Sequence, residues 1–307
     1  MQADVRPEWT VLRTADPITA EVQALFDRGA EFMLNERAKP APRVPSLATP
    51  HGRNPVSAQA AQVAARHGDV VRLASAWSGR WATFLGDQVV IRVIHDSSND
   101  DVIAQTEALA GLPRAPQLIE VDRSAGVIVE RRFPGRTLDS AWEGLSTSAR
   151  RRSAREILDF RDELSSVPLS ASAIEAAKGR LERDVNQLFG PELSGWALQQ
   201  LGNDVRWRHC DLHAENILVD DRSGEVTAVV DWEWADVTVA ALDQSRILAV
   251  GAYQVGREWG LEAAGAIDPD TLLVAFALHT VPHAHQPGQS AFYDAILSSV
   301  RARAGAA

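Results

Sequence analysis

The sequence predicts an α+β protein in which a small β-rich lobe precedes a larger α-rich lobe. Residues 69–132 hold short apolar runs separated by turn residues, which is typical of strands. Residues 133–201 have a helical composition. The length of 307 residues suffices for one large domain or two lobes, and the sequence contains no internal repeat.

Composition and charge exclude several classes of protein. The net charge of −10 disfavours nucleic acid and anionic membranes as partners. Cys210 is the single cysteine, so an intrachain disulfide and a zinc site of several cysteines are ruled out. Charged residues interrupt every apolar stretch, and the N-terminus lacks the pattern of a secretory signal. We therefore expect a cytoplasmic protein. The sequence leaves open whether it is a monomer or a homodimer.

Residues 1–56 are predicted to form an N-terminal extension. A helix is expected over residues 18–35, where apolar residues recur at helical spacing. Residues 39–56 carry five prolines, which is typical of an extended linker.

The predicted N-lobe, residues 57–132, combines two helices with five strands. The helices are expected at residues 57–67 and 99–112. Gly86 and Asp87 lie between two strand-like runs and are a two-residue hairpin signal. The strands are expected at residues 69–75, 80–85, 88–94, 116–122 and 126–132.

The predicted C-lobe, residues 133–307, is helical to about residue 201. Three strand-like runs follow, written VRWRHC, NILVDD and GEVTAVVDW, and Arg222-Ser223-Gly224 makes a turn between the last two. Four polar side chains lie within residues 209–216, on the loop expected where the first two runs meet: His209, Asp211, His213 and Asn216. Asp231 lies at the far end of the third run, and we expect it beside the same loop.

This polar group suits phosphoryl transfer. One carboxylate, Asp211, would accept or orient the proton of the attacking hydroxyl, while Asn216 and Asp231 would supply hard oxygen ligands to Mg²⁺. One alternative is that all of them are plain loop and cap residues. A zinc site would lack a third and a fourth ligand, and Ser-His-Asp hydrolysis would lack a G-x-S-x-G segment.

The segments HCDLHAEN and VVDWEWADVTVAALD resemble the signature of the aminoglycoside phosphotransferase family, and the resemblance extends weakly over residues 70–250. It implies a two-lobed, protein-kinase-like fold and transfer of the γ-phosphoryl group of ATP or GTP, with Mg²⁺, to a hydroxyl of a small molecule. By this resemblance Asp211 is the catalytic base, and Asn216 and Asp231 are the Mg²⁺ ligands.

The same resemblance implies three residues that support the catalytic loop. They are His209, His213 and Asp243, and Asp243 is expected to cap a helix and hold the loop.

The resemblance also implies that the N-lobe binds the nucleotide. Arg92 stands where a strand lysine is usual, and Glu107 on the next helix is its expected partner. A loop around Ser78 is expected to cover the phosphates. Glu130 and Arg132 belong to the expected hinge, where backbone groups would read the purine. The alternative is that Arg92 is an ordinary strand cation and Glu107 a solvated helix residue.

The sequence leaves the acceptor open. An antibiotic of the aminoglycoside, cationic peptide or nucleoside type, inactivated to give resistance, is the preferred class. The alternatives are a metabolic kinase for a sugar, amino alcohol or nucleoside, and a non-catalytic relative that binds nucleotide. Candidate acceptor contacts are the acidic residues Glu215, Glu233 and Asp236 and the aromatic residues Trp232 and Trp234. A pocket wall or a plain loop, rather than a metal site, is expected for His279, His283 and His285.

Overall fold

The computed structural model describes residues 24, 55–75, 81–94, 99–280 and 290–306. The described chain divides into two compact units, which we treat separately. The sheet unit contains the described residues of Met33–Leu145 and Glu215–Ala235, and the helical unit contains those of Met1–Phe32, Ser146–Ala214 and Asp236–Ala307. The α+β prediction is confirmed. The expected helix at residues 18–35 lies outside the described residues, except for residue 24.

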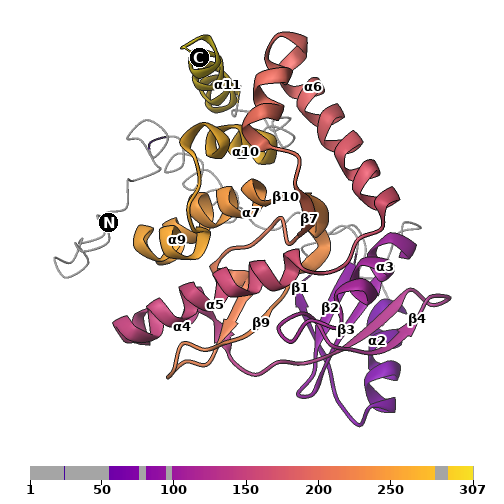
Figure 1. Ribbon diagram of the computed structural model, residues 1–307. Coiled ribbons are helices and arrows are strands. Elements are labelled where there is room, and N and C mark those ends of the chain that lie inside the picture. The colour runs from indigo at the N-terminus through magenta and orange to yellow at the C-terminus, as the bar shows by residue number, and fades with distance from the viewer. Residues whose placement is uncertain (1–23, 25–54, 76–80, 95–98, 281–289, 307) are drawn as a thin grey trace. The chain divides into compact units, whose positions relative to one another are not determined.

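A five-stranded antiparallel sheet forms the centre of the sheet unit (Figure 1). Its strand order is β1-β2-β3-β5-β4. All five strands lie within the runs that the sequence indicates. The hairpin predicted near residues 86 and 87 is present, but its two turn residues are Asp87 and Gln88, because the amide of Gly86 donates to the carbonyl of Val89 at 2.8 Å. The strands are β1 (Arg72–Ser75), β2 (Trp81–Leu85), β3 (Val89–Ile94), β4 (Leu118–Asp122) and β5 (Val127–Arg131).

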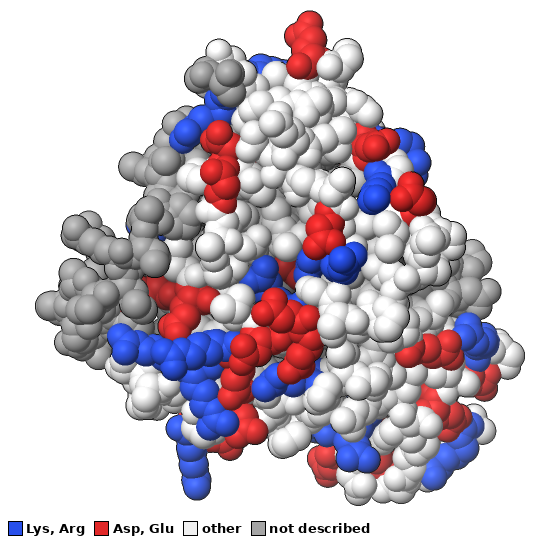
Figure 2. All heavy atoms as spheres, in the orientation of Figure 1, with Lys and Arg blue, Asp and Glu red and all other residues white. Residues whose placement is uncertain are grey.

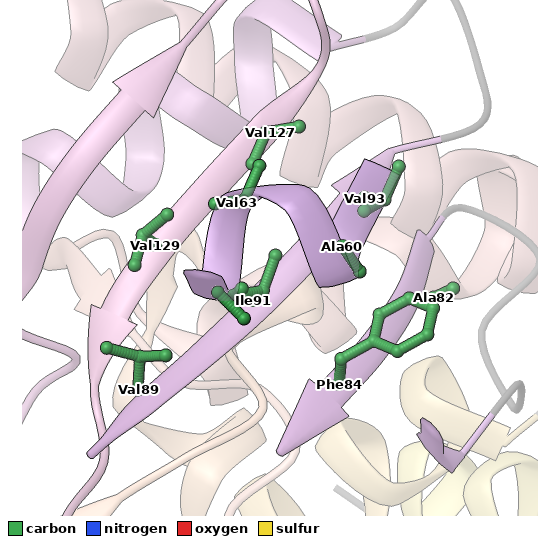
Figure 3. Close-up of a cluster of buried hydrophobic side chains, with 10 residues drawn as sticks. Ala60, Val63, Ala82, Phe84, Val89, Ile91, Val93, Val127 and Val129 are labelled. Atoms are coloured by element: carbon green, nitrogen blue, oxygen red, sulfur yellow. The ribbon is translucent and has the colours of Figure 1, made fainter. Parts of the chain in front are cut away.

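Among the described residues, a helix packs on each face of this sheet. On one face, α2 (Pro55–Arg66) packs on alternate residues of the strands, such as Ile91 and Val129 (Figure 3). On the other face, Ile103 of α3 (Asn99–Leu109) packs against the sheet, beside strand residues such as Ile94. Since side chains alternate along a strand, the face of Ile94 also carries Arg92.

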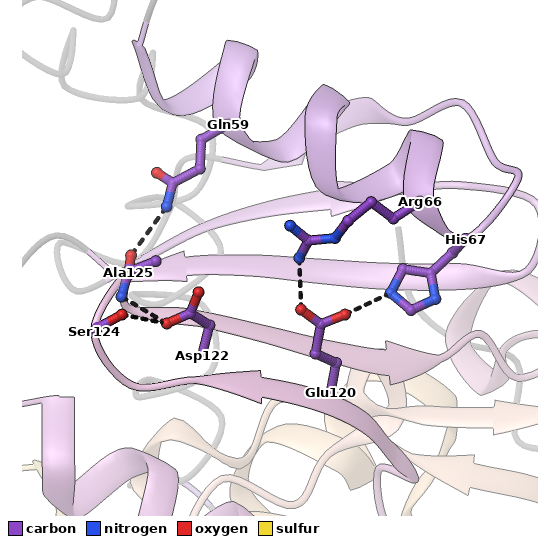
Figure 4. Close-up of polar contacts among 7 residues, drawn as sticks. All are labelled: Gln59, Arg66, His67, Glu120, Asp122, Ser124 and Ala125. Atoms are coloured by element: carbon purple, nitrogen blue, oxygen red, sulfur yellow. Dashed lines mark hydrogen bonds and ion pairs between the residues drawn. The ribbon is translucent and has the colours of Figure 1, made fainter.

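Polar contacts reinforce the packing of α2 (Figure 4). Nε2 of Gln59 donates to the carbonyl oxygen of Ala125 at 3.0 Å. At the other end of the helix, Glu120 accepts from Arg66 at 2.5 Å and lies 3.0 Å from Nε2 of His67. Both ends of α2 are thus tied to the strand pair β4–β5.

A smaller sheet of order β6-β8-β9 also belongs to the sheet unit. Its strands are β6 (Arg136–Thr137), β8 (Ile217–Val219) and β9 (Val226–Val229). The amide of Val229 donates to the carbonyl of Arg114 at 2.8 Å, which ties this sheet to the segment after α3. The division of the chain by contacts therefore differs from the predicted boundary between residues 132 and 133. The strands β6, β8 and β9 group with the larger sheet, whereas the prediction placed them in the C-lobe.

The helical unit is built around a two-stranded antiparallel sheet. The strand β7 (Val205–Arg208) pairs with β10 (Asp236–Val239), a strand that the sequence analysis did not predict. The helix α6 (Ala171–Leu201) is interrupted at Gly190, whose φ of 71° departs from the helix just before Pro191. The other helices of this unit are α5 (Thr147–Ser165), α7 (Ala240–Arg246), α8 (Ala252–Val255), α9 (Arg257–Ala264), α10 (Pro269–Thr280) and α11 (Ser290–Ala306).

Three short helical turns complete the parts of the chain that matter for the site. They are η3 (Ala214–Asn216), η4 (Trp232–Trp234) and η5 (Ile247–Gly251), of which the last is π-helical. None of the described helices combines the length and the apolar composition that a membrane span requires.

Candidate active site

Asp211 lies between β7 and η3, and its carboxylate is bound by Arg246, the last residue of α7. The Arg246 atoms Nε and Nη2 lie 2.7 and 2.5 Å from Oδ1 of Asp211. The second oxygen, Oδ2, lies 3.5 Å from Nε2 of His213. The side chains of Asp211 and Arg246 are only 13% and 9% exposed, so water screens this ion pair weakly.

The electrostatics of this pair keep Asp211 charged. Burial raises the pKa of the Asp211 carboxyl, but the charge of Arg246 and the contact with His213 outweigh burial, so the pKa falls well below its ordinary value. Asp211 is therefore ionised at neutral pH. A carboxylate of such low basicity is suited to orienting a hydroxyl whose proton leaves late.

The backbone around Asp211, residues 209–214, is here called the Asp211 loop. The fully buried carboxylate of Asp243 accepts from the amides of His209 and Cys210 at 3.4 and 2.7 Å. At the far end of the loop, Oε1 of Gln254 accepts from the amide of Ala214 at 3.0 Å. Two side chains thus fix the two ends of the loop.

The expectation that Asp243 caps a helix is wrong. The N-cap of α7 is Val239, and no side-chain bond closes that end. Asp243 is the fourth residue of α7, so its carboxylate serves the Asp211 loop instead.

The two loop histidines are buried. His209 is fully buried, and its Nδ1 lies 3.3 Å from the amide nitrogen of Asp211. His213 is 2% exposed and faces the carboxylate of Asp211. Both side chains pack within the helical unit, where they can support the loop.

Asn216 and Asp231 lie in the sheet unit, at one end of the β8–β9 hairpin. The carbonyl of Asn216 accepts from the amide of Val230 at 2.8 Å, and Asp231 is the next residue. Asp231 has a φ of 66°, an unusual backbone conformation for a residue with a side chain. Carboxylate and amide oxygens are what Mg²⁺ prefers, with water and phosphate oxygens completing its shell, so these residues fit that ion.

The described residues offer little to a metal ion that requires a protein cage. Among them, no group of three or more His, Cys, Asp or Glu side chains could hold a metal. The zinc interpretation of the Asp211 loop gains no support from this geometry.

Arg92 has a different partner from the expected one. Its Nε lies 3.3 Å from Oε2 of Glu130, and both side chains are buried. Arg92 pairs with Ile128 across β3 and β5, so Glu130, two residues further on, shares its face of the sheet. Glu107 instead bonds Arg123 at 2.5 Å on the surface. The predicted pairing of Arg92 with Glu107 is therefore wrong.

The rest of the expected nucleotide-binding set is only partly described. Ser78 lies outside the described residues. The guanidinium of Arg132 donates to the carbonyl of Gly86, and its amide donates to the carbonyl of Gln88 at 2.8 Å. Arg132 thus ties the end of β5 to the β2–β3 hairpin.

The expected acceptor residues fall in both units. In the sheet unit Glu215 is half-buried, and Trp234 is exposed whereas Trp232 is buried and donates to the carbonyl of Val229. In the helical unit Asp236 accepts from Arg180 at 2.7 Å.

Three further expected residues give little to compare. His279 lies in the last turn of α10 in the helical unit. The side chain of Glu233 and all of His283 and His285 lie outside what the structure describes.

Sequence reasoning missed Arg246 and Gln254. Arg246 follows Asp243 by three residues in a helix, and that spacing places both on one face, which was a usable signal. Gln254 is eleven residues beyond Asp243 across a π-helical turn, and no sequence pattern marks it.

Comparison with known proteins identifies a matching family and several similar folds. Residues 69–271, more than half of the chain, match the family described as the phosphotransferase enzyme family. No curated protein matches the sequence.

Several solved structures share the fold at low sequence identity. APH(3'')-Id from Streptomyces rimosus, in complex with ADP and streptomycin, is 17% identical with a TM-score of 0.53 over 74% of this chain and 97% of that chain. The streptomycin–ATP–APH(2")-IIa complex is 15% identical with a TM-score of 0.52, over 77% and 91%. ADP-bound APH(2'')-Ib is 14% identical with a TM-score of 0.51, over 75% and 91%.

Proposed function

This chain belongs to the phosphotransferase enzyme family and is a small-molecule kinase, and we propose that Asp211 is the residue that meets its acceptor hydroxyl. The hydroxyl oxygen attacks the γ-phosphorus, and the bond from the γ-phosphorus to the oxygen that bridges it to the β-phosphate breaks. The nucleoside diphosphate leaves, and the hydroxyl proton passes late in the step to Asp211. The observation that carries the proposal is the Asp211 carboxylate itself, which is mostly shielded from water, ionised and held by Arg246 on a loop with fixed ends. A positioned carboxylate can align a hydroxyl without first removing its proton.

Asn216 and Asp231 are proposed to hold Mg²⁺. Their place at one end of the β8–β9 hairpin and their oxygen donors support this role. When bound, Mg²⁺ would neutralise charge on the β- and γ-phosphates.

The donor is proposed to be ATP or GTP, with Arg92 contacting its phosphates. The buried ion pair with Glu130 supports this role, because it fixes the guanidinium on a strand of the sheet unit. The two relatives solved with ADP and the one solved with ATP support an adenine nucleotide.

For the acceptor we propose a hydroxylated antibiotic of the aminoglycoside class, inactivated by phosphorylation. The support is that two relatives of the same fold were solved with streptomycin. Charge alone does not select a cationic acceptor, because blue and red side chains lie beside one another on the face in Figure 2 and Asp236 already bonds Arg180. A sugar, amino alcohol or nucleoside is the alternative outcome of the test below.

A panel assay tests the proposal. The full-length chain is incubated with Mg²⁺, ATP or GTP, and aminoglycosides, macrolides, nucleosides, sugars and amino alcohols one at a time. Product mass is then measured, and transfer adds one phosphate to the acceptor. We expect transfer to at least one aminoglycoside, with none when Mg²⁺ is chelated. Transfer only to metabolites would contradict the antibiotic class, and nucleotide binding without transfer to any acceptor would contradict the kinase proposal.

A further inference from the structure

We propose that Arg246 is a positioning residue, which holds the Asp211 carboxylate in one orientation so that it can align an acceptor hydroxyl. The proposal deepens the role given to Asp211 above and rests on it. Arg246 belongs to none of the motif positions that suggested the function, and its role comes from the geometry of the helical unit.

The contact between the two side chains is specific in its atoms. Both Nε and Nη2 of Arg246 approach the same oxygen, Oδ1, at 2.7 and 2.5 Å. An ammonium on a flexible stem cannot offer two donors in this fixed fork. Because two donors converge on Oδ1, rotation of the carboxylate would break at least one hydrogen bond.

Arg246 lies on a segment, Asp243 to Gln254, that contacts the Asp211 loop at several points. Asp243, three residues before it, accepts from the start of the loop, and Gln254, eight residues after it, accepts from the end. Between them Gly251, the last residue of the π-helical turn, comes close to the loop. A Cβ at Gly251 would lie 3.8 Å from Cα of His213. These contacts thus fix the backbone of Arg246 and the backbone of Asp211 relative to each other.

Burial explains why the pair must act together. Each side chain is about one-tenth exposed, so removing either partner leaves a buried charge without its counter-charge. A structural ion pair would have the same property. The distinction is that a positioning residue changes catalysis only through Asp211, whereas a structural residue changes it with or without Asp211.

A double-mutant cycle separates these readings. The four proteins are the wild type, Arg246→Met, Asp211→Asn and the double variant, and transfer is measured at saturating nucleotide. We expect Arg246→Met to lower kcat by about 10²-fold in the wild-type background, the size of loss expected from a misplaced catalytic group. In the Asp211→Asn background we expect a further loss of less than about 3-fold. The KM for nucleotide should change less than about 3-fold in every variant.

Two further variants sharpen the cycle. Arg246→Lys keeps the charge and loses the fork, so we expect a kcat between those of the wild type and Arg246→Met. Arg155→Met removes an exposed arginine of the same unit, which bonds Glu262 at 2.9 Å, and should leave kcat within about 2-fold. Equal fold-losses from Arg246→Met in both backgrounds would overturn the proposal.

Thermal unfolding of the same four proteins provides a readout that does not need activity. The double variant should melt at a higher temperature than the sum of the two single losses predicts, because it buries no unpaired charge. Strictly additive losses would overturn the pairing even in an active enzyme. A third outcome is that the losses of melting temperature are not additive but the wild type transfers phosphate to no acceptor. That outcome would support the pairing and overturn the proposed function.

Discussion

Replacing Asp243 with alanine is expected to destabilise the protein far more than the loss of a surface carboxylate. Asp243 is fully buried and accepts from two backbone amides of the Asp211 loop, at 3.4 and 2.7 Å. It also stabilises two buried arginines. Burial lowers the pKa of Arg161 and of Arg208, and the charge of Asp243 opposes that shift in both.

The expected loss follows from these contacts. A buried amide that loses its acceptor costs about 1–3 kcal/mol, so two amides give about 2–6 kcal/mol. Removing one partner from a buried charge cluster costs about 3–5 kcal/mol. The two estimates describe overlapping effects, so we expect about 3–5 kcal/mol for Asp243→Ala, or roughly 10 °C in Tm. Asp243→Asn keeps one acceptor oxygen and should lose less.

Urea and thermal unfolding of the purified variants measure this loss. The control is Glu175→Ala on α6, which removes a 73% exposed carboxylate that bonds Lys178 and should change stability by less than about 0.5 kcal/mol. Such comparisons carry an error of about 0.5 kcal/mol, so a difference of about 1 kcal/mol is significant. If the free energies of unfolding of Asp243→Ala and of the control differ by less than that, Asp243 does not hold the loop.

Three further predictions concern the sheet unit. Arg92→Met should weaken nucleotide affinity at least about 10-fold by calorimetry, and Glu130→Gln should weaken it more than Glu107→Gln does; equal effects of the two glutamine variants would count against the buried pair. Asp231→Ala should abolish Mg²⁺-dependent transfer while circular dichroism stays native, and full turnover in the folded variant would remove Asp231 from the metal site. Asp69 accepts from backbone amides around the β2–β3 turn, with Gln88 first, and they lower its pKa to about 2. Since this pKa lies below the ordinary value of 3.8, Asp69 contributes to the free energy of unfolding above pH 4, and the contribution is lost as the pH falls toward 2. The difference in stability between the wild type and Asp69→Asn should therefore narrow over that range. A difference that does not depend on pH would contradict this role of Asp69.

The five-stranded sheet was predictable because its strands are short apolar runs that alternate with turn residues. Five apolar runs and one hairpin signal gave all five strands, with boundaries within a few residues of those observed. The partner of Arg92 was not predictable in the same way. The sequence shows that an arginine lies on a strand, but the face it shares with Glu130 depends on the register between β3 and β5.

The candidate site divides along the same line. The spacing of Asp211, Asn216 and Asp231 singled them out as candidates, since phosphoryl transfer can use one carboxylate for the acceptor hydroxyl and two oxygen ligands for Mg²⁺. Arg246 escaped because its contact with Asp211 joins residues 35 positions apart. The strand β10 was not predicted either. It is only four residues long, and its pairing with β7 is a contact of the folded unit that no local sequence pattern indicates.

The most direct test of the account is the effect of Asp211→Asn on transfer and on nucleotide binding, measured in the same preparation. Calorimetry gives the affinity for Mg²⁺-nucleotide, and product mass gives the rate of transfer to an acceptor found in the panel. Asp204→Asn, which removes a 74% exposed carboxylate of the same unit, is the control.

We expect Asp211→Asn to bind Mg²⁺-nucleotide within about 3-fold of the wild type, because the role proposed for Asp211 is contact with the acceptor and not with the donor. Transfer should fall by about 10²–10⁴-fold, the loss typical of a positioned acid–base group. If the variant instead loses Mg²⁺-nucleotide binding but turns over normally once saturated, Asp211 is a metal or structural residue and the account of this site is wrong.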